Sequence, residues 1–479
     1  MTALELSRLQ FAVVTVYHYL FVPLSISLSV LTAGLQTAWW RNRDPRFGRA
    51  TMLVGKLLMA TFAVGVVTGL VQEFQFGLSW SAFARYYGDV FGPTLAIEGM
   101  LAFFLEATFL GLWWFGRDRL RPLVHLATIW VVAVGTLISA YVILAANAFM
   151  QHPVGVAIDP ATGRAQLSSF GALITNEVVV AAFPHTMAGA FMAGGALLLA
   201  LGVWRRWKGA GSADEAPTWR LLARVGAWTT LVGGVAVALT GDVLGKVMTE
   251  VQPMKMAAAE ALYETTSHAP FSVFAVQLPG HAQPVSLDIP WLLSFLATGD
   301  PTATVQGIDD LQAQYATQFG AGNYTPWIPV AYWTFRLMIG FGVLATAVAA
   351  WVLWRTRRGR DLEPAGRGWF ALGDRWLVRF LPVIPALPAA AATVGWLFTE
   401  TARQPWLVFG LFRTADGVSP TLTPTELVAS LAGFALVYGV LAVVWVRLVV
   451  HVSRGGLVDL VPEQAETNPA ESVVPEPSY

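Results

Sequence analysis

Long apolar segments alternate with short polar ones along most of the chain. A membrane-spanning helix needs about 20 mostly apolar residues, and nine segments fit that pattern. Prolines interrupt two of them, at Pro184 and at Pro382, Pro385 and Pro388, but neighbouring groups can satisfy the backbone atoms that a proline frees. The predicted spans are residues 11–38, 53–76, 94–115, 124–148, 179–204, 221–245, 327–354, 380–402 and 427–450. This pattern predicts an all-α polytopic membrane protein with about nine transmembrane helices.

Basic residues gather in alternate connections between these spans. The clusters follow the first, third, fifth and seventh predicted spans, at residues 41–49, 117–121, 205–208 and 355–375. Cytoplasmic loops of membrane proteins are enriched in Lys and Arg. We therefore expect the N-terminus outside and the C-terminus in the cytoplasm, which agrees with an odd number of spans.

One connection is much longer than the others. Residues 246–326 contain about 80 residues, whereas helix connections usually take 2–8, so this outside loop is expected to carry a function. The C-terminal residues are rich in Pro, Glu and Ser, a composition typical of disorder. We divide the chain into spans one to six (1–245), an extracytoplasmic loop (246–326), spans seven to nine (327–455) and a disordered cytoplasmic tail (456–479).

Composition narrows the chemistry. Hydrophobic residues make up 55% of the chain and charged residues 13%, against about 25% charged in soluble domains, which supports a lipid bilayer as the solvent. Acidic and basic residues balance at 30 each, so no net charge favours nucleic acid. The absence of cysteine excludes disulfides, thiolate metal sites and cysteine nucleophiles. A transition metal would need histidine, methionine or carboxylate ligands.

Five polar or sulfur-containing side chains are predicted in the outer half of the membrane. They are His18, Glu98, His185, Met338 and Glu400. Each has a structural alternative, because a lone histidine is often only hydrogen-bonded and methionine fills gaps in a core. As a group they suit haem iron, for which axial His and Met are usual ligands.

Two arginines lie close to these residues in sequence. Arg403 follows Glu400 by three positions, so the carboxylate could simply form an ion pair. Arg336 precedes Met338 by two, and it could extend outward to the interface. Both alternatives stay open on the sequence alone.

The third predicted span carries two carboxylates, Glu98 and Glu106. In an α-helix this spacing rotates the second by about 80° and moves it about 12 Å deeper. Staggered acids inside a membrane suit a proton relay, although both could be protonated and packed. Ser139, Asn147 and Lys56 are further polar groups within spans that could extend such a path.

The long loop contains an amide, an ammonium and a carboxylate within a few residues, at Gln252, Lys255 and Glu260. Lys255 and Glu260 are five residues apart, too far round a helix for a good pair. They could converge on a ligand with two oxygen ends, or they could be solvated surface charges.

The sequence resembles subunit I of the cytochrome bd-type quinol oxidases over nearly the whole chain, to about residue 455. The length of the loop 246–326 is similar to that of the subgroup with a short quinol-binding loop (Q-loop). The motifs that carry the resemblance are Glu5 to Phe11 with Tyr17-His18, Gly55-Lys56, Glu73 to Gly77, Leu95 to Glu106, His185-Thr186, Gly241-Asp242, Gln252 to Glu260, Phe335 to Met338, and Gly395-Trp396 with Arg403-Gln404-Pro405-Trp406.

That resemblance implies two haem b groups, one low-spin and one high-spin, and one haem d. His185 and Met338 would be the axial ligands of the low-spin haem b iron. His18 would bind the haem d iron, with Glu98 on or near its other face, and Glu400 would bind the iron of the high-spin haem b. Which of the two high-spin sites holds haem d stays open.

The resemblance assigns roles to eight further residues. Arg336 and Arg403 would neutralise haem propionates or nearby carboxylates, and Trp396 would lie between haems. The residues expected at the quinol site are Gln252, Lys255 and Glu260. Those expected in the proton path from the cytoplasm are Glu106 and Ser139.

The implied activity is that of an electrogenic quinol:oxygen oxidoreductase of the bacterial plasma membrane. It would oxidise ubiquinol or menaquinol at the outer face and reduce O2 to water with cytoplasmic protons, generating proton motive force without pumping. A second membrane subunit is the implied partner, with small accessory subunits left open. Two alternatives remain: a proton-coupled transporter, and the cyanide-insensitive subtype in which haem b replaces haem d.

Overall fold

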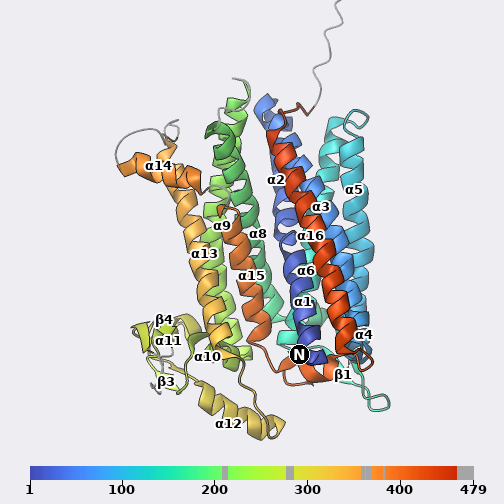
Figure 1. Ribbon diagram of the computed structural model, residues 1–479, viewed down its shortest axis with the longest axis vertical. Coiled ribbons are helices and arrows are strands. Elements are labelled where there is room, and N and C mark those ends of the chain that lie inside the picture. The colour runs from blue at the N-terminus through green and yellow to red at the C-terminus, as the bar shows by residue number, and fades with distance from the viewer. Residues whose placement is uncertain (208–213, 277–284, 358–361, 363–368, 381–382, 461–479) are drawn as a thin grey trace, which may run out of the picture.

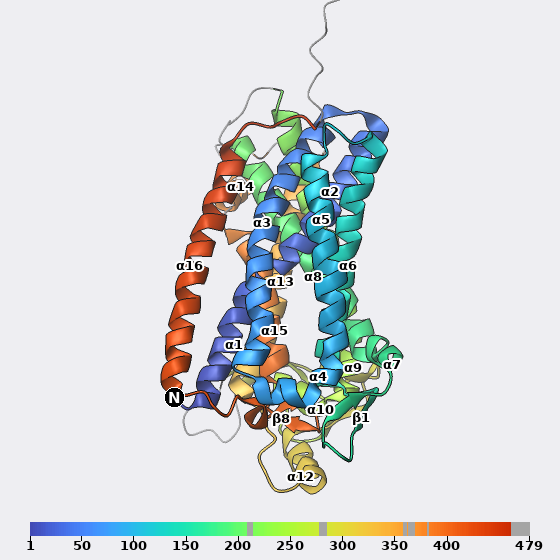
Figure 2. The same cartoon turned by 90° about the vertical axis from the view of Figure 1, so that its right-hand side faces the viewer.

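The computed structural model describes residues 1–207, 214–276, 285–357, 362, 369–380 and 383–460. Parts of two basic connections, of the long loop, of the eighth predicted span and of the tail lie outside these residues. Within them the apolar segments form long helices that stand side by side in one bundle (Figures 1 and 2). The all-α prediction is confirmed.

Eight helical stretches of the described chain are long and apolar enough to cross a membrane. Three of them are broken. The first consists of α1 and α2, which are separated at Leu20 and Phe21, and the fifth consists of α7 and α8, which are separated at Thr175 and Asn176. The third contains a π-helical segment, η1, between α4 and α5. The helices of these stretches are α1 (Ala3–Tyr19), α2 (Val22–Asn42), α3 (Pro45–Leu78), α4 (Ser81–Ile97), η1 (Glu98–Phe103), α5 (Phe104–Phe115), α6 (Pro122–Gln151), α7 (Phe170–Ile174), α8 (Glu177–Trp207), α9 (Ala216–Val251), α13 (Ile328–Arg355) and α16 (Pro424–Arg454).

The predicted span 380–402 differs from the other eight. It appears as α15 (Ala386–Thr401), a helix of 16 residues that is about 24 Å long at 1.5 Å per residue, short of the roughly 30 Å hydrocarbon core. It begins after Pro385, because proline ends or starts helices more readily than it continues them. Of the nine predicted spans, eight are thus candidate membrane spans in the described chain. The ninth, α15, runs beside α13, and α14 (Trp369–Arg379) lies across the end of the bundle (Figure 1).

Helix starts follow local signals in the sequence. Thr2 caps α1 and Thr423 caps α16, and in each case the glutamate three residues later, Glu5 or Glu426, bonds back to the threonine backbone. Asp44 caps α3 and is followed by a proline in the first turn. These side chains satisfy amide groups that a helix N-terminus leaves without partners.

The surface of the bundle is apolar where lipid would contact it. Leu239 on α9 is 68% exposed and Leu436 on α16 is 71% exposed. Tightly packed side chains such as Trp113 and Trp219, each 1% exposed, fill the interior. An apolar exterior of this extent is typical of a membrane protein.

In the described chain, four two-stranded antiparallel sheets and four short helical segments cap the end of the bundle at which the N-terminus lies (Figure 1). The sheets pair β1 (Val156–Ile158) with β2 (Ala165–Leu167), β3 (Thr266–Ser267) with β6 (Thr304–Val305), β4 (Phe271–Val276) with β5 (Val285–Ile289), and β7 (Trp406–Val408) with β8 (Phe412–Arg413). The helical segments are α10 (Pro253–Glu260), α11 (Leu292–Thr298), α12 (Ile308–Phe319) and the 3-10 turn η4 (Thr414–Gly417). The long predicted loop is thus a structured cap.

The last helix, α16, ends at the opposite end of the bundle (Figure 1). The residues after it stay packed as far as the structure describes them. Asp459 accepts a hydrogen bond from Arg49 at 2.8 Å, and Leu460 is 2% exposed. Most of the predicted tail, residues 461–479, lies outside the described chain.

Candidate functional site

Each of the two histidines predicted to bind metal lies against a threonine on the neighbouring helix. Nδ1 of His18, on α1, is 2.9 Å from Oγ1 of Thr68 on α3. Nδ1 of His185, on α8, is 3.4 Å from Oγ1 of Thr240 on α9. Within the described chain, Nε2 of neither ring has a hydrogen-bond partner. Both rings can therefore offer Nε2 to a metal.

Met338 lies where α13 packs on α15. A Cβ atom added at Gly395 would meet the Met338 sulfur at 2.7 Å, so glycine is what allows the thioether to lie there. The next residue, Trp396, packs beside Phe11 of α1 with ring centroids 6.4 Å apart. The Gly395-Trp396 motif thus joins the helix of Met338 to the helix of His18.

Glu400 and Arg403 form the ion pair that the sequence allowed, with Nη2 of Arg403 2.5 Å from Oε2 of Glu400. The other carboxylate oxygen accepts a hydrogen bond from Asn147 on α6 at 2.9 Å. Arg403 is 3% exposed. Its Nε and Nη1 atoms have no partner in the described structure, so this buried cation retains unused donors.

Lys255 is buried in α10, with 2% of its surface exposed. Its Nζ atom lies 2.5 Å from Oε1 of Gln151, the last residue of α6, and the Gln252 amide donates to the Gln151 carbonyl at 2.6 Å. Burial, and after it the positive charge of Arg403, lowers the pKa of Lys255 to about 7 against the opposing charge of Glu400. The alternative of a solvated surface charge is wrong for Lys255.

Glu260 is also buried, and it pairs with Arg336. Nη2 of Arg336 is 2.5 Å from Oε2 of Glu260, and the same guanidinium donates to the carbonyl groups of Ser272 and Ala259. The Arg336 side chain is 8% exposed, so it does not extend outward to the interface. Burial raises the pKa of Glu260, although Arg336 acts to lower it.

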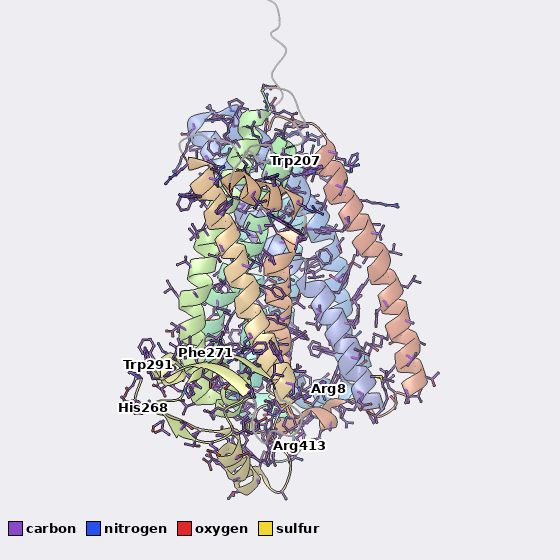
Figure 3. The ribbon with its side chains drawn as sticks, turned by 60° about the vertical axis from the view of Figure 1, so that its left-hand side comes forward. Arg8, Trp207, His268, Phe271, Trp291 and Arg413 are labelled. Carbon is purple, nitrogen blue, oxygen red and sulfur yellow. The ribbon has the colours of Figure 1, made fainter. Side chains whose placement is uncertain are left out.

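Lys255 and Glu260 therefore have separate partners in the described structure, one on α6 and one on α13. Phe271, over whose ring the Arg336 guanidinium lies at 5.0 Å, marks the Glu260 side of the cap beneath the bundle (Figure 3). Arg413 lies farther along the same cap (Figure 3) and donates to the Tyr324 hydroxyl at 2.8 Å. The cap thus holds its buried charges by specific contacts.

The two carboxylates of the third span both face α6. Ser139 donates to Glu98 at 3.4 Å, and Thr136, one helical turn away, hydrogen-bonds Glu106. Glu98 opens the π-helical segment η1, so the 80° rotation expected from a regular α-helix does not apply. Ser139 therefore lies beside Glu98. The residue beside Glu106 is Thr136, which the sequence analysis did not propose.

One helix therefore links most of these groups. Along α6, four side chains meet an acid or an amine of the site: Thr136 meets Glu106, Ser139 meets Glu98, Asn147 meets Glu400, and Gln151 meets Lys255. Gln151 was missed in the sequence. Residues 136 and 147 are 11 positions apart, about three helical turns, and residue 151 follows one turn later. These polar residues therefore form a stripe along one face of an apolar helix, and that stripe could have identified Gln151 from the sequence.

A small cavity lies between α10, α12 and the segment after α15. Gln252, Lys255, Tyr315, Arg403 and Trp406 contribute to its lining. In the described structure, Oε1 of Gln252, two nitrogens of Arg403 and Nε1 of Trp406 are buried without partners. Buried polar groups are nearly always hydrogen-bonded, so the nitrogens of Arg403 and Trp406 suit a ligand with oxygen acceptors, and Oε1 of Gln252 suits a ligand with a donor group.

Comparison with known proteins identifies the family. The model of the family described as cytochrome bd terminal oxidase subunit I matches residues 6–457. The chain belongs to this family. It is 38% identical over 458 residues to cytochrome bd ubiquinol oxidase subunit 1 of Bacillus subtilis (strain 168), covering 95% of this chain and 94% of that protein. Cytochrome bd-II ubiquinol oxidase subunit 1 of Escherichia coli (strain K12) is 31% identical over 514 residues, covering 95% and 96%.

The fold agrees with an experimental structure of the family. The bd oxidase from Geobacillus thermodenitrificans matches with a TM-score of 0.82 at 29% identity, covering 94% of this chain and 98% of that one. The chain is thus a multi-pass, all-helical membrane protein of the cytochrome bd family, and membership implies haem. The transporter alternative has no support from these relatives.

Proposed function

We propose that this protein is the haem-binding subunit of a terminal oxidase in the bacterial plasma membrane. It oxidises membrane quinol, ubiquinol or menaquinol, at the outer face and reduces O2 to water with cytoplasmic protons, which makes turnover electrogenic without a pump. The observation that carries the proposal is the hydrogen-bonded series Lys255–Gln151–Asn147–Glu400. It joins the cap formed by the loop 246–326, proposed as a short Q-loop, to the partly buried carboxylate of Glu400 in the bundle.

The residues present fit haem. The described chain holds no group of three or more His, Asp or Glu side chains that could bind a metal ion by themselves, and haem iron needs only one or two protein ligands. The unpartnered N–H groups of Arg403 and Trp406 suit propionate oxygens. Glycines face three proposed ligands: an added Cβ would lie 3.1 Å from His18 at Gly69, 3.2 Å from His185 at Gly241 and 2.7 Å from Met338 at Gly395.

The ligands are assigned on this basis. His185 and Met338 hold the iron of a low-spin haem b, His18 holds that of haem d with Glu98 nearby, and Glu400 holds that of a high-spin haem b. When bound, these groups supply the electron transfer and the oxygen chemistry. The protein orients them: Arg403 and Asn147 fix the Glu400 carboxylate, Arg336 supplies positive charge near Met338, and Trp396 packs between α15 and α1.

In the cap, Gln252, Lys255 and Glu260 bind the quinol head group. An uncharged Lys255 amine can accept a proton from a quinol hydroxyl, which an ammonium cannot do. In the bundle, Glu106, Ser139 and Glu98 form the proton path, with Thr136 holding the first carboxylate. We place the N-terminus outside, the end of α16 in the cytoplasm, and a second membrane subunit against the exposed apolar surface.

The test is a visible spectrum of the purified complex with pyridine haemochrome analysis, which fixes haem number and type together. Haem d with two haem b is expected. A spectrum without the red chlorin band would select the subtype with haem b throughout, and absence of haem would refute the proposal. His185→Ala and Met338→Leu should lose the low-spin signal, and Glu400→Ala the high-spin haem b. A variant that keeps its full signal would refute that ligand assignment.

A further inference from the structure

A Thr-Gly pair lies against the ring of each proposed histidine ligand. Thr68-Gly69 on α3 lies against His18, and Thr240-Gly241 on α9 lies against His185. In each pair the threonine hydroxyl meets Nδ1 of the ring, and the glycine lies against Cε1, where an added Cβ would come within 3.1 or 3.2 Å. The two pairs lie on different helices and hold rings from different helices.

The hydroxyl protons of these threonines are already committed to the backbone. Thr240 Oγ1 donates to the Ala236 carbonyl at 2.6 Å, and Thr68 Oγ1 lies 3.0 Å from the carbonyls of both Val64 and Gly65. A hydroxyl has one proton and two lone pairs. Because the proton is given to a carbonyl, the oxygen can only accept from the imidazole, so Nδ1 must carry the ring hydrogen.

The backbone three residues before each threonine also contacts the ring. The His18 ring also hydrogen-bonds the backbone of Gly65, and the His185 ring that of Val237, in each case three residues before the threonine. The amide nitrogens of these positions lie inside helices, so their carbonyl oxygens are the available partners. With the ring hydrogen on Nδ1, as the threonine contacts require, the Nε2 lone pair is free for another partner.

We propose that Thr68 and Thr240, each with the glycine that follows it, are positioning residues that set the tautomer and ring plane of His18 and His185. This inference rests on the proposed function, in which those two rings bind haem iron. The threonine acceptor strengthens electron donation from Nε2 to the metal, as outer hydrogen bonds to metal-bound imidazoles generally do. The glycine lets the ring lie flat against the neighbouring helix.

The test replaces each hydroxyl with a methyl group in the intact complex and measures haem midpoint potentials by spectroelectrochemistry. Thr240→Val should raise the potential of the low-spin haem b alone, because weaker donation stabilises ferric iron less. Thr68→Val should raise that of the haem on His18 alone, and by more, since its contact is shorter at 2.9 Å. For a one-electron couple, a tenfold change in the equilibrium constant between ferric and ferrous haem shifts the midpoint potential by about 59 mV.

Controls separate positioning from general structure. Thr240→Ser keeps the hydroxyl and should keep the potential. Thr230→Val removes a buried hydroxyl of α9 that bonds only the Gly226 carbonyl, and it should change neither potential. Should Thr240→Val fail to assemble, Thr240→Ala removes the same hydroxyl without a branched side chain.

The outcomes separate a failure of this inference from a failure of the proposed function on which it rests. Fully loaded Thr240→Val and Thr68→Val complexes with unchanged potentials would overturn the positioning role even if His185→Ala had lost the low-spin haem. Retention of the low-spin haem in His185→Ala would instead refute the ligand assignment itself.

Discussion

Glu260 of the cap and Arg336 of α13 form a buried ion pair, with 2.5 Å between carboxylate oxygen and guanidinium nitrogen. Arg336 precedes Met338 by two residues, so the pair fixes the proposed quinol loop to the helix that carries a proposed iron ligand. The guanidinium also donates to the backbone carbonyls of Ala259 and Ser272, so it binds two segments of the cap to α13.

Breaking this pair should destabilise the protein strongly. Arg336→Met leaves Glu260 buried without a cation, and loss of one partner of a buried pair costs about 3–5 kcal/mol. We expect the thermal unfolding midpoint, followed by tryptophan fluorescence, to fall markedly. Arg336→Met/Glu260→Gln should recover part of the loss because no uncompensated charge remains. Equal losses in the single and double variants would contradict a coupling between these two residues.

Gly395 provides a second test, through the space that it leaves for Met338. Alanine in a helix is normally more stable than glycine by about 0.5–1 kcal/mol, but here its Cβ would lie 2.7 Å from the Met338 sulfur. Gly395→Ala should therefore displace the thioether and remove most of the low-spin haem signal in a reduced-minus-oxidised spectrum. Gly340→Ala on α13, where nothing lies within 4 Å of the added atom, is the matched control. An unchanged spectrum for Gly395→Ala would argue against Met338 as a ligand.

Much of the fold could be predicted from local pattern. Apolar length located every long helix, because the backbone of a membrane span must satisfy its own hydrogen bonds. The same criterion failed for residues 380–402, where prolines shorten the helix to 16 residues. The π-helical turn that begins at Glu98 was also unexpected, since side-chain type alone does not specify an extra residue in a turn.

The candidate site could be predicted only in part, because pairings depend on tertiary packing. Spacing alone suggested the Glu400–Arg403 pair, three residues apart on adjacent turns. Nothing local indicated that Lys255 would be buried against Gln151, 104 residues away in sequence. Solvated charge was the reasonable alternative there, and burial under α12 and the segment after α15 overrides it.

The proton path can be tested at Glu106. Glu106→Gln preserves shape but cannot carry a proton, so O2 reduction should slow on the order of 100-fold, as for loss of a group that transfers protons, with the haem spectrum intact. Thr136→Val leaves the carboxylate in place and removes a hydroxyl that hydrogen-bonds Glu106 and the Val132 carbonyl, so it should cost much less. Oxygen consumption by the purified complex with excess quinol is the measurement. A Glu106→Gln enzyme at full rate would exclude this carboxylate from the path.

The pH dependence of quinol oxidation should report Lys255. Burial and Arg403 lower its pKa to about 7 from an ordinary value near 10.4, so the side chain is charged below pH 7 and neutral above. Only the neutral amine can accept a proton from quinol. With soluble quinol, kcat/KM should therefore rise about tenfold per pH unit up to about pH 7 and then level off. Lys255→Met and Lys255→Arg, which have no amine that becomes neutral there, should lose that rise.

The control for this profile is Lys246→Met. Lys246 lies at the same end of the bundle and pairs with Asp242 at 2.6 Å, outside the proposed quinol site, so its loss should leave the profile unchanged. The free energy of unfolding should also rise with pH, which gives a second check on Lys255. Between about pH 7 and 10.4 the unfolded chain binds a proton at Lys255 that the native state does not, so this residue makes the free energy of unfolding rise with pH in that window. In Lys255→Met that contribution should vanish, and a rise of equal size in both proteins would show that Lys255 is not the group that titrates.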